Sequence, residues 1–489
     1  MSKKSLRDFA TLAASITAAG SLLVGFTAAL PTASATLAVP AGYETIRVTE
    51  KPDGKDKKLT IETLTTPRSE YIQKPVLLTG DADDYVMLAG KNTKPANQKI
   101  ARSLPGYNPW QHPAPEGDGP DTDEVDYANG YSPEKLFTLY KSDVPEKISF
   151  VSVISGYDAA IHNKAIYNQN LETTIAINNN ASMVQIQRAV EDSDDENIST
   201  MSDAMGGKMG KIFRDLYNSG KLPKLQQLIG GSLSRAFHFM NATGLEKFTY
   251  RNPRPFAVAK DRIKYYYEDL DDAAEDEGYR NLVWSYPSGH TNRAYIKGII
   301  LATILPEIAP QLMARASEVG YNRIVMGVHY PLDVIAGRMT GTASMAQHWA
   351  DARFRPLFYE AMQEVRSSLE KKCGTTIATC TKQGLQWLSA KESVRVYTER
   401  MTYGFPKIGP KGVKFTVPTY AEELLRTIFP KLTKHQRKMV LQATALESGY
   451  PLDINGPDGG WQRVNFAKAF AAKVTVQRDG SLIISYPKA

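Results

Sequence analysis

Three short segments of the chain carry most of its information: Lys247-x6-Arg254-Pro255, then Pro287-Ser288-Gly289-His290, then Asn322-Arg323-x5-His329-x3-Asp333. Together they bring one lysine, two arginines, two histidines, a Ser-Gly turn and an aspartate into less than a fifth of the 489 residues. Side chains of these types in one region indicate a site that binds an anion and performs acid-base chemistry on it.

The cationic side chains suit a phosphoryl group. Phosphoryl transfer spreads negative charge over three equatorial oxygens, which a protein stabilises with fixed donors. The guanidinium groups of Arg254 and Arg323 can bind phosphate oxygens in pairs, and the Lys247 ammonium adds a point charge. Ser288 and Gly289 precede a predicted helix at 291–304, so backbone N–H groups at its start can point at the same anion.

Two histidines can divide the work of an in-line displacement. One neutral imidazole attacks phosphorus to form a phosphohistidine, and the other, protonated, donates a proton to the departing alkoxide. Asp333 lies four residues after His329, and Pro331 predicts a helix that begins between them. The carboxylate can then accept a hydrogen bond from Nδ1 and leave Nε2 free to attack. We therefore expect His329 to be the nucleophile, Asp333 its orienting group and His290 the general acid.

These motifs resemble the type 2 phosphatidic acid phosphatase (PAP2) superfamily, and within it the secreted class A bacterial nonspecific acid phosphatases. The pattern is matched at every position except Asn322, where the family usually has serine. The resemblance covers about residues 136–345 and implies a mainly α fold with a PAP2/haloperoxidase-like helical bundle core, an acidic optimum and no metal cofactor. It implies the following site residues: Lys247, Arg254, Ser288, Gly289 and Arg323 as phosphate ligands, His290 as the acid, His329 as the nucleophile and Asp333 as its orienter.

The expected activity is hydrolysis of small-molecule phosphate monoesters with broad specificity. A vanadium-dependent haloperoxidase is one alternative, but the 31 residues between His290 and Asn322 are few, which resembles the phosphatases. A phosphatidate or lipid phosphate phosphatase is a second alternative. A phosphate-binding protein on the same scaffold is a third, and it would require the loss of a catalytic group, whereas His290, His329 and Asp333 are all present.

The N-terminus has the pattern of an export signal. Basic residues precede an apolar stretch at 9–30, and Ala33-Ser34-Ala35 provides a small-residue cleavage motif. We expect a signal peptide at 1–35, cleaved after Ala35, and a secreted or cell-envelope protein. An uncleaved membrane anchor is the alternative.

The remaining composition limits the partners. Beyond the signal the sequence has no apolar run of the ~18 residues that a bilayer span needs, so no stable span is expected after signal removal. The net charge of +7 is mild, and no compact Lys/Arg patch with interleaved aromatic residues predicts nucleic-acid binding. The acidic run at 191–196 is interpreted as solvated surface. Oligomeric state is not indicated.

Cys373 and Cys380 are the two cysteines, and they enclose six residues. In an exported protein this spacing predicts a local disulfide loop rather than a metal site.

The chain divides into four predicted parts: the signal at 1–35, a loop-rich N-terminal extension at 36–131, the catalytic domain at 132–369 and a C-terminal extension at 370–489. Helical periodicity in the catalytic domain predicts a bundle, with helices at 182–190, 209–218, 222–243, 291–304, 310–320, 331–350 and 353–369. A further helical stretch is predicted at 420–447. Small β-hairpins are predicted at both ends, at 44–64 around Asp53-Gly54 and at 474–486 around Asp479-Gly480.

Overall fold

The computed structural model of the protein describes residues 43–53, 56–64, 149–193, 198–230, 234–237, 243–264, 266, 284–384 and 387–487. The predicted signal peptide and the loop-rich part of the N-terminal extension lie outside the described residues. All of the described residues belong to one compact unit.

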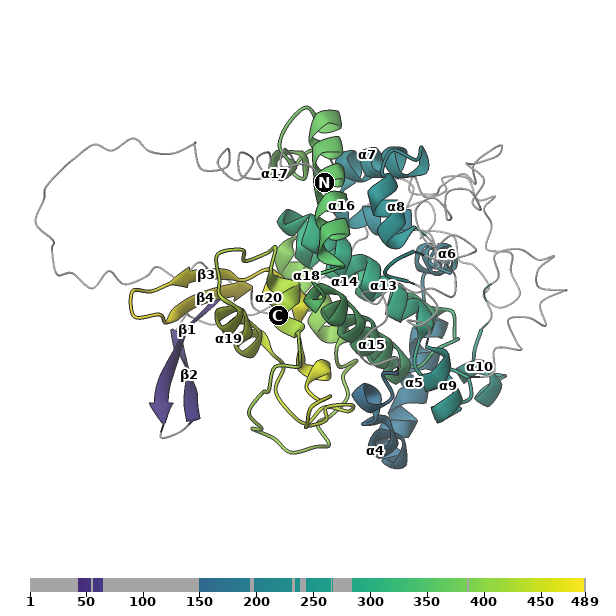
Figure 1. Ribbon diagram of the computed structural model, residues 1–489. Helices are drawn as coiled ribbons and strands as arrows, with labels where there is room; N and C mark the ends of the chain where they lie inside the picture. Colours follow the sequence, from purple (N-terminus) through teal and green to yellow (C-terminus); the bar gives the residue numbers. More distant parts are fainter. Residues whose placement is uncertain are drawn as a thin grey trace, which may run out of the picture. The chain divides into compact units, whose positions relative to one another are not determined.

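Most of the described chain is helical, which confirms the expected mainly α fold (Figure 1). Three long helices, α13 (Gly289–Ile304), α14 (Ala309–Val325) and α15 (Pro331–Ala350), are buried on nearly all sides and form the centre. The other α-helices are α4 (Tyr157–His162), α5 (Lys164–Asn180), α6 (Met183–Glu191), α7 (Gly207–Asn218), α8 (Pro223–Ile229), α9 (Gly244–Tyr250), α10 (Pro255–Val258), α16 (Arg355–Cys373), α17 (Ile377–Cys380), α18 (Ala390–Arg400), α19 (Lys434–Thr444) and α20 (Phe466–Phe470). Short 3-10 helices are η2 (Ser152–Ile154), η3 (Ile198–Met205), η5 (Pro306–Ile308), η6 (Ala421–Leu425) and η7 (Trp461–Arg463).

The limits of the central helices follow from local sequence. Ser288 caps the start of α13 by accepting a hydrogen bond from the backbone N–H of Thr291. Pro306 follows the end of α13, and Pro331 occupies the first position of α15, where its missing N–H has no partner to lose. These proline and cap positions are visible in the sequence and agree with the helices predicted at 291–304 and 331–350.

Two glycines on α15 allow the start of α13 to lie directly against it. A Cβ atom on Gly337 would be 2.5 Å from the carbonyl oxygen of Ser288, and one on Gly341 would be 2.5 Å from the carbonyl oxygen of Asn292. No side chain fits at these distances, so glycine is required for the two helices to approach this closely. This contact fixes the Pro-Ser-Gly-His turn relative to the first turn of α15.

Two predicted helices are wrong in part. The helix predicted at 222–243 ends at Ile229, because the next two residues, Gly230 and Gly231, are both poor helix formers. The backbone N–H of Gly230 donates the last hydrogen bond, to the carbonyl of Gln226. The stretch at 420–447 contains η6 and α19 separated by residues 426–433, which include Pro430, and α19 starts with a capping box at Thr433. Helices α5 and α18 were not predicted.

The two predicted hairpins are confirmed, and they join into one sheet. Strands β1 (Tyr43–Asp53) and β2 (Asp56–Leu64) form the first hairpin, and β3 (Lys473–Val476) and β4 (Leu482–Pro487) form the second. β1 also pairs with β4 in antiparallel register, which gives the order β2-β1-β4-β3. Ile46 lies opposite Ile484 in this pairing, and both side chains are buried. The two ends of the described chain therefore stabilise each other.

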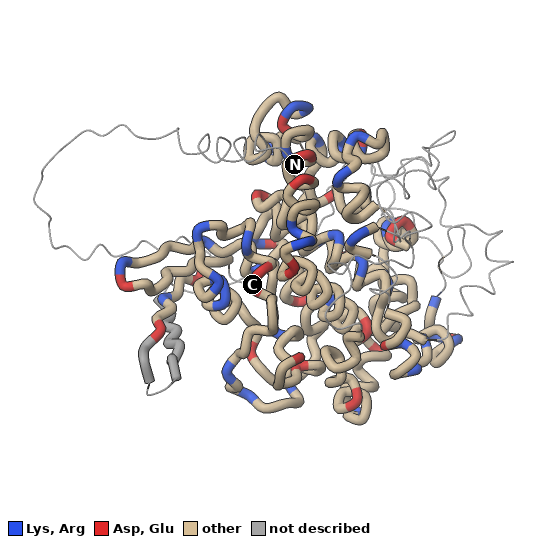
Figure 2. Tube along the Cα trace, viewed as in Figure 1, with Lys and Arg blue, Asp and Glu red and all other residues tan. Residues whose placement is uncertain are grey.

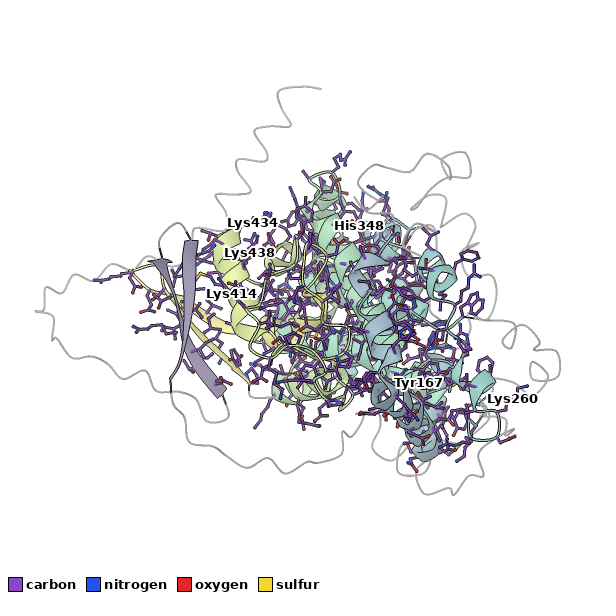
Figure 3. All side chains as sticks on the ribbon, turned by 90° about the horizontal axis from the view of Figure 1, so that it is seen from below. Tyr167, Lys260, His348, Lys414, Lys434 and Lys438 are labelled. Atoms are coloured by element: carbon purple, nitrogen blue, oxygen red, sulfur yellow. A yellow bond between two sulfur atoms is a disulfide. The ribbon has the colours of Figure 1, made fainter. Side chains whose placement is uncertain are left out.

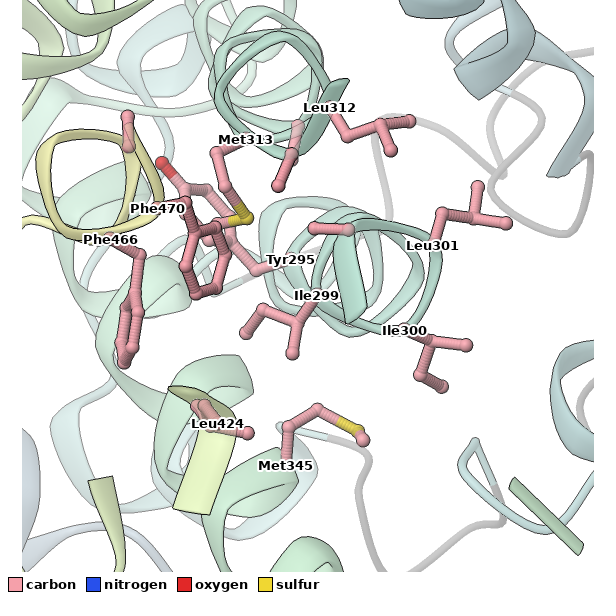
Figure 4. Close-up of a cluster of buried hydrophobic side chains, with 14 of the residues drawn as sticks. Tyr295, Ile299, Ile300, Leu301, Leu312, Met313, Met345, Leu424, Phe466 and Phe470 are labelled. Atoms are coloured by element: carbon pink, nitrogen blue, oxygen red, sulfur yellow. The ribbon is translucent and has the colours of Figure 1, made fainter. Parts of the chain in front are cut away.

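The C-terminal segments share the central hydrophobic core. Phe466 and Phe470 of α20 and Leu424 of η6 lie beside Tyr295 and Met313 of α13 and α14 (Figure 4). On α15, the buried guanidinium of Arg338 donates hydrogen bonds to the backbone carbonyls of residues 461, 462 and 464 at 3.3, 2.9 and 3.4 Å. Residues after 370 thus pack tightly against the helices that hold the candidate site.

The described residues carry charges of both signs and one disulfide bond. Lys and Arg positions are interspersed with Asp and Glu positions along the described trace (Figure 2). The predicted disulfide is confirmed between Cys373 and Cys380, with their Cα atoms 6.0 Å apart, and it closes a loop at the end of α16.

Candidate active site

The predicted nucleophile lies between α14 and α15. His329 is 2% exposed, and its Nδ1 atom is 3.1 Å from Oδ2 of Asp333. The same carboxylate oxygen accepts a 2.9 Å hydrogen bond from the backbone N–H of Tyr330. Asp333 thus stabilises the first turn of α15 and orients the imidazole at the same time. A carboxylate that accepts from Nδ1–H leaves the lone pair on Nε2.

Arg254 lies beside Nε2 of His329, the nitrogen expected to attack. Its Nη1 atom is 3.3 Å from Nε2 of His329 and donates a 2.9 Å hydrogen bond to the backbone carbonyl of Val328. Arg254 is buried and immediately precedes α10, whose first residue is Pro255. The guanidinium is therefore held beside Nε2 of His329, where it can bind an anion.

Lys247 connects α9 to the segment that enters the Pro-Ser-Gly-His turn. Its Nζ atom donates to the backbone carbonyls of Trp284 and Ser285 at 3.1 and 3.0 Å. Asn252 binds the same segment, because its carbonyl accepts from the Ser285 backbone N–H at 2.8 Å. Burial, together with the positive charges of Arg254 and Arg323, lowers the pKa of Lys247 to about 7.

The Ser-Gly turn is fixed by both neighbouring helices. The hydroxyl of Ser288 accepts from the backbone N–H and the hydroxyl of Thr291. The backbone N–H of Ser288 donates to the carbonyl of Asp333 at 3.0 Å. Gly289 is the first residue of α13, a helix long enough to present its N-terminal N–H groups to an anion.

His290 and Arg323 meet at the C-terminal end of α6. Nε2 of the half-buried His290 is 3.0 Å from the backbone carbonyl oxygen of Ser193. Nη1 of Arg323 donates a 2.8 Å hydrogen bond to the hydroxyl of the same serine. Burial and the positive charge of Arg323 lower the pKa of His290 well below its ordinary value. Sequence reasoning missed Ser193, because a serine that follows a short helix carries no distinguishing signal.

The acidic run that starts at 191 is not simply solvated surface, so that interpretation is wrong for Asp192. Asp192 is buried, and Arg315 binds both of its carboxylate oxygens at 2.9 and 2.5 Å. Asn322 donates a further 2.7 Å hydrogen bond to it. Burial alone would raise the pKa of Asp192, but Arg315, Arg188 and Asn322 hold that pKa below its ordinary value.

The two members of the His329–Asp333 pair have pKa values shifted in opposite directions. Burial and the positive charges of Arg254 and Lys247 lower the pKa of His329 well below its ordinary value. Burial raises the pKa of Asp333 to about 7, against the lowering effect of the Tyr330 backbone N–H. The lowered pKa of His329 favours its neutral form, and the neutral imidazole is the nucleophilic one.

A surface hollow of about 290 Å³ lies elsewhere, beside α19. Lys414 and Lys438 contribute to its lining and lie on the side of the molecule away from Tyr167 and Lys260 (Figure 3). His435, also in the lining, pairs with Glu50 at 3.0 Å. The hollow contains none of the predicted site residues.

The described residues show neither a cluster of metal ligands nor a single membrane-spanning helix. No three His, Cys, Asp or Glu side chains in this part of the chain gather as a metal ion would require. Within the same residues no individual helix has the length and apolar character needed to cross a bilayer. α13 and residues 306–325 reach that length and apolar character only together, and the two are bent by 119° relative to each other.

Comparison with known proteins agrees with the sequence motifs. Residues 229–355 match the sequence model of the PAP2 superfamily. A non-specific acid phosphatase of Salmonella typhimurium is 29% identical over 189 residues, which are 38% of this chain and 67% of that protein. An acid phosphatase of Zymomonas mobilis is 31% identical over 151 residues, which are 31% of this chain and 52% of that protein. A non-specific acid phosphatase of Providencia stuartii is 26% identical over 142 residues, which are 29% of this chain and 53% of that protein. The chain is therefore similar to the PAP2 superfamily over residues 229–355 and to non-specific acid phosphatases.

Proposed function

We propose that the protein is a phosphoric monoester hydrolase of the acid phosphatase type and that it works through a phosphohistidine at His329. The observation that carries this proposal is the 3.3 Å distance between Nε2 of His329 and Nη1 of Arg254, while Nδ1 is held by Asp333. A buried imidazole whose Nε2 lone pair faces a guanidinium that can bind phosphate is arranged for attack on phosphorus.

In the first step, Nε2 of His329 attacks phosphorus, the N–P bond forms and the P–O bond to the leaving group breaks. Protonated His290 gives its proton to the departing alkoxide, so an alcohol leaves. Lys247, Arg254 and Arg323 stabilise the charge on the equatorial oxygens. Asp333 stabilises the positive charge that the attacking imidazole acquires.

In the second step, water replaces the alcohol. Neutral His290 accepts a proton from the water as its oxygen attacks phosphorus, the N–P bond breaks and phosphate leaves. His329 returns to its neutral form and His290 is again protonated. The enzyme is unchanged after both steps, as catalysis requires.

Substrate range and location are part of the same proposal. The cationic residues assigned above would bind the phosphoryl group, which all monoesters share, so we infer broad specificity for small-molecule monoesters. All positive charge in the two steps comes from protein side chains, so hydrolysis should proceed in EDTA. Export is inferred from the apolar stretch at 9–30 and the Ala33-Ser34-Ala35 motif, and the disulfide is consistent with an oxidising compartment.

A trapping experiment tests the mechanism. The protein is mixed with ³²P-labelled substrate and quenched in alkali, where phosphohistidine is stable. We expect label on the wild-type protein, none on His329→Ala, and p-nitrophenyl phosphate hydrolysis that survives EDTA. A labelled His329→Ala protein would contradict the assignment, and vanadate-dependent bromide oxidation without hydrolysis would favour the haloperoxidase alternative.

A further inference from the structure

The turn formed by Asp192 and Ser193 contacts two residues of the candidate site from outside the three sequence motifs. The Ser193 carbonyl lies 3.0 Å from Nε2 of His290, and the Ser193 hydroxyl accepts from Arg323 at 2.8 Å. One residue therefore touches the expected general acid through its backbone and an expected phosphate ligand through its side chain.

The turn is itself fixed by one face of α14. Arg315 and Asn322 are seven residues apart, about two helical turns, so both side chains project from the same face. Both bind the carboxylate of buried Asp192, at 2.5 to 2.9 Å. Arg323, the next residue, binds Ser193. A buried carboxylate held by three donors is a rigid support, because breaking such a pair leaves uncompensated buried charge.

We propose that Ser193 is a positioning residue that sets the direction of the Arg323 guanidinium and of the His290 ring, and that the Asp192–Asn322 hydrogen bond holds Ser193 in place. The proposal rests on the function proposed above. It gives Asn322 a role that explains the departure from serine at this position: the carboxamide reaches Asp192 and ties the turn to α14.

Ser193→Ala separates the two contacts, since it removes the hydroxyl and keeps the carbonyl. Arg323 loses the acceptor that orients it, so we expect weaker binding of inorganic phosphate and of orthovanadate, a phosphate mimic, by about 5- to 20-fold. The KM for p-nitrophenyl phosphate should rise by a similar factor, with a smaller change in kcat. Ser193→Thr keeps a hydroxyl and should restore most of the affinity.

Ser219→Ala is the matched control. Ser219 also follows the end of a helix, α7, and its hydroxyl donates to carbonyls of that helix, those of Asp215 and Leu216, as the Ser193 hydroxyl does to Ala189 at 3.2 Å. Ser219 differs from Ser193 in being exposed. Its substitution should leave vanadate affinity unchanged within about 2-fold.

Asn322→Ala tests the support of the turn. Protonation of the leaving group matters most for alkyl phosphates, which have poor leaving groups, and least for p-nitrophenyl phosphate. If the turn positions His290, kcat for an alkyl phosphate should fall about 10-fold more than kcat for p-nitrophenyl phosphate. Equal losses on the two substrates would overturn the role of this hydrogen bond.

Calorimetric vanadate binding is the deciding measurement, because it does not require turnover. Wild-type affinity in Ser193→Ala, or an equal loss in Ser193→Thr and Ser193→Ala, would overturn the positioning role. If Ser193→Ala lowers Tm more than Ser219→Ala does, the Thr variant decides: restored affinity supports the proposal and unrestored affinity overturns it. A wild-type protein that binds vanadate but hydrolyses no monoester would contradict the proposed function alone.

Discussion

The Nδ1 atom of His329 lies 3.1 Å from Oδ2 of Asp333, and both side chains are buried at the start of α15. His329 lies two residues before the helix that Pro331 begins, and Asp333 lies in the first turn of that helix, so the helix start sets the geometry of the pair. The carboxylate fixes the imidazole tautomer in which Nε2 faces Arg254.

Asp333→Asn should therefore slow the chemical step more than it weakens binding. Asparagine has nearly the same shape, but its amide can donate to Nδ1 and favour the wrong tautomer, and it cannot stabilise an imidazolium. We expect kcat to fall by roughly 10²- to 10⁴-fold with little change in KM. Steady-state kinetics on p-nitrophenyl phosphate, with Tm as a check on folding, measures both. A kcat within about 5-fold of wild type would show that Asp333 does not orient the nucleophile.

Arg254→Lys keeps the positive charge and removes the planar pair of donors. We expect kcat/KM to fall by about 100-fold or more, because an ammonium cannot contact Val328, His329 and two phosphate oxygens together. Arg262→Lys is the control, since Arg262 is exposed and pairs with exposed Glu172 at 2.6 Å. Similar kinetic losses in the two variants would argue against a specific role for Arg254.

The pH dependence of kcat/KM and that of kcat should report different pKa values of His290, one for the free enzyme and one for the enzyme-substrate complex. Burial and Arg323 lower the pKa of His290, so its protonated form, which the first step needs, is lost as pH rises through that lowered pKa. We expect kcat/KM to decline with rising pH from a point below 6.5. A bound phosphate group stabilises the imidazolium, so the decline of kcat should occur at higher pH. The His290→Gln variant should not show this decline with rising pH. A wild-type kcat/KM that increases between pH 5 and 8 would contradict the assignment of His290.

Gly337→Ala should damage the site through packing alone. The added Cβ would lie 2.5 Å from the Ser288 carbonyl oxygen, so the start of α13 must move. We expect a loss of about 1–3 kcal/mol in the free energy of unfolding, with a clear loss of activity. Gly244→Ala is the control, because a Cβ at the first residue of α9 meets no atom within 4 Å. Thermal or urea unfolding of both variants checks this, and equal stabilities would mean that α13 and α15 can separate without cost.

Features set by neighbouring residues were predictable from the sequence. The disulfide between Cys373 and Cys380 depends on a short loop, both hairpins depend on turn residues and alternating strands, and the start of α15 depends on Pro331. The His329–Asp333 contact belongs to this group, because Asp333 is the third residue of α15 and its carboxylate reaches back to the residues just before the helix.

The sequence by itself thus determined the helical class, the PAP2-type motifs and the local pairs. Only the tertiary structure decided that β1 pairs with β4, which brings the Thr45 hydroxyl to that of Ser485 across 440 positions. It also decided that the acidic residue Asp192 is buried and that Ser193 contacts both His290 and Arg323. The physical reason is that local periodicity and caps act over one or two turns, whereas these contacts depend on which buried faces pack together, and a polar residue in sequence looks the same whether water or an arginine solvates it.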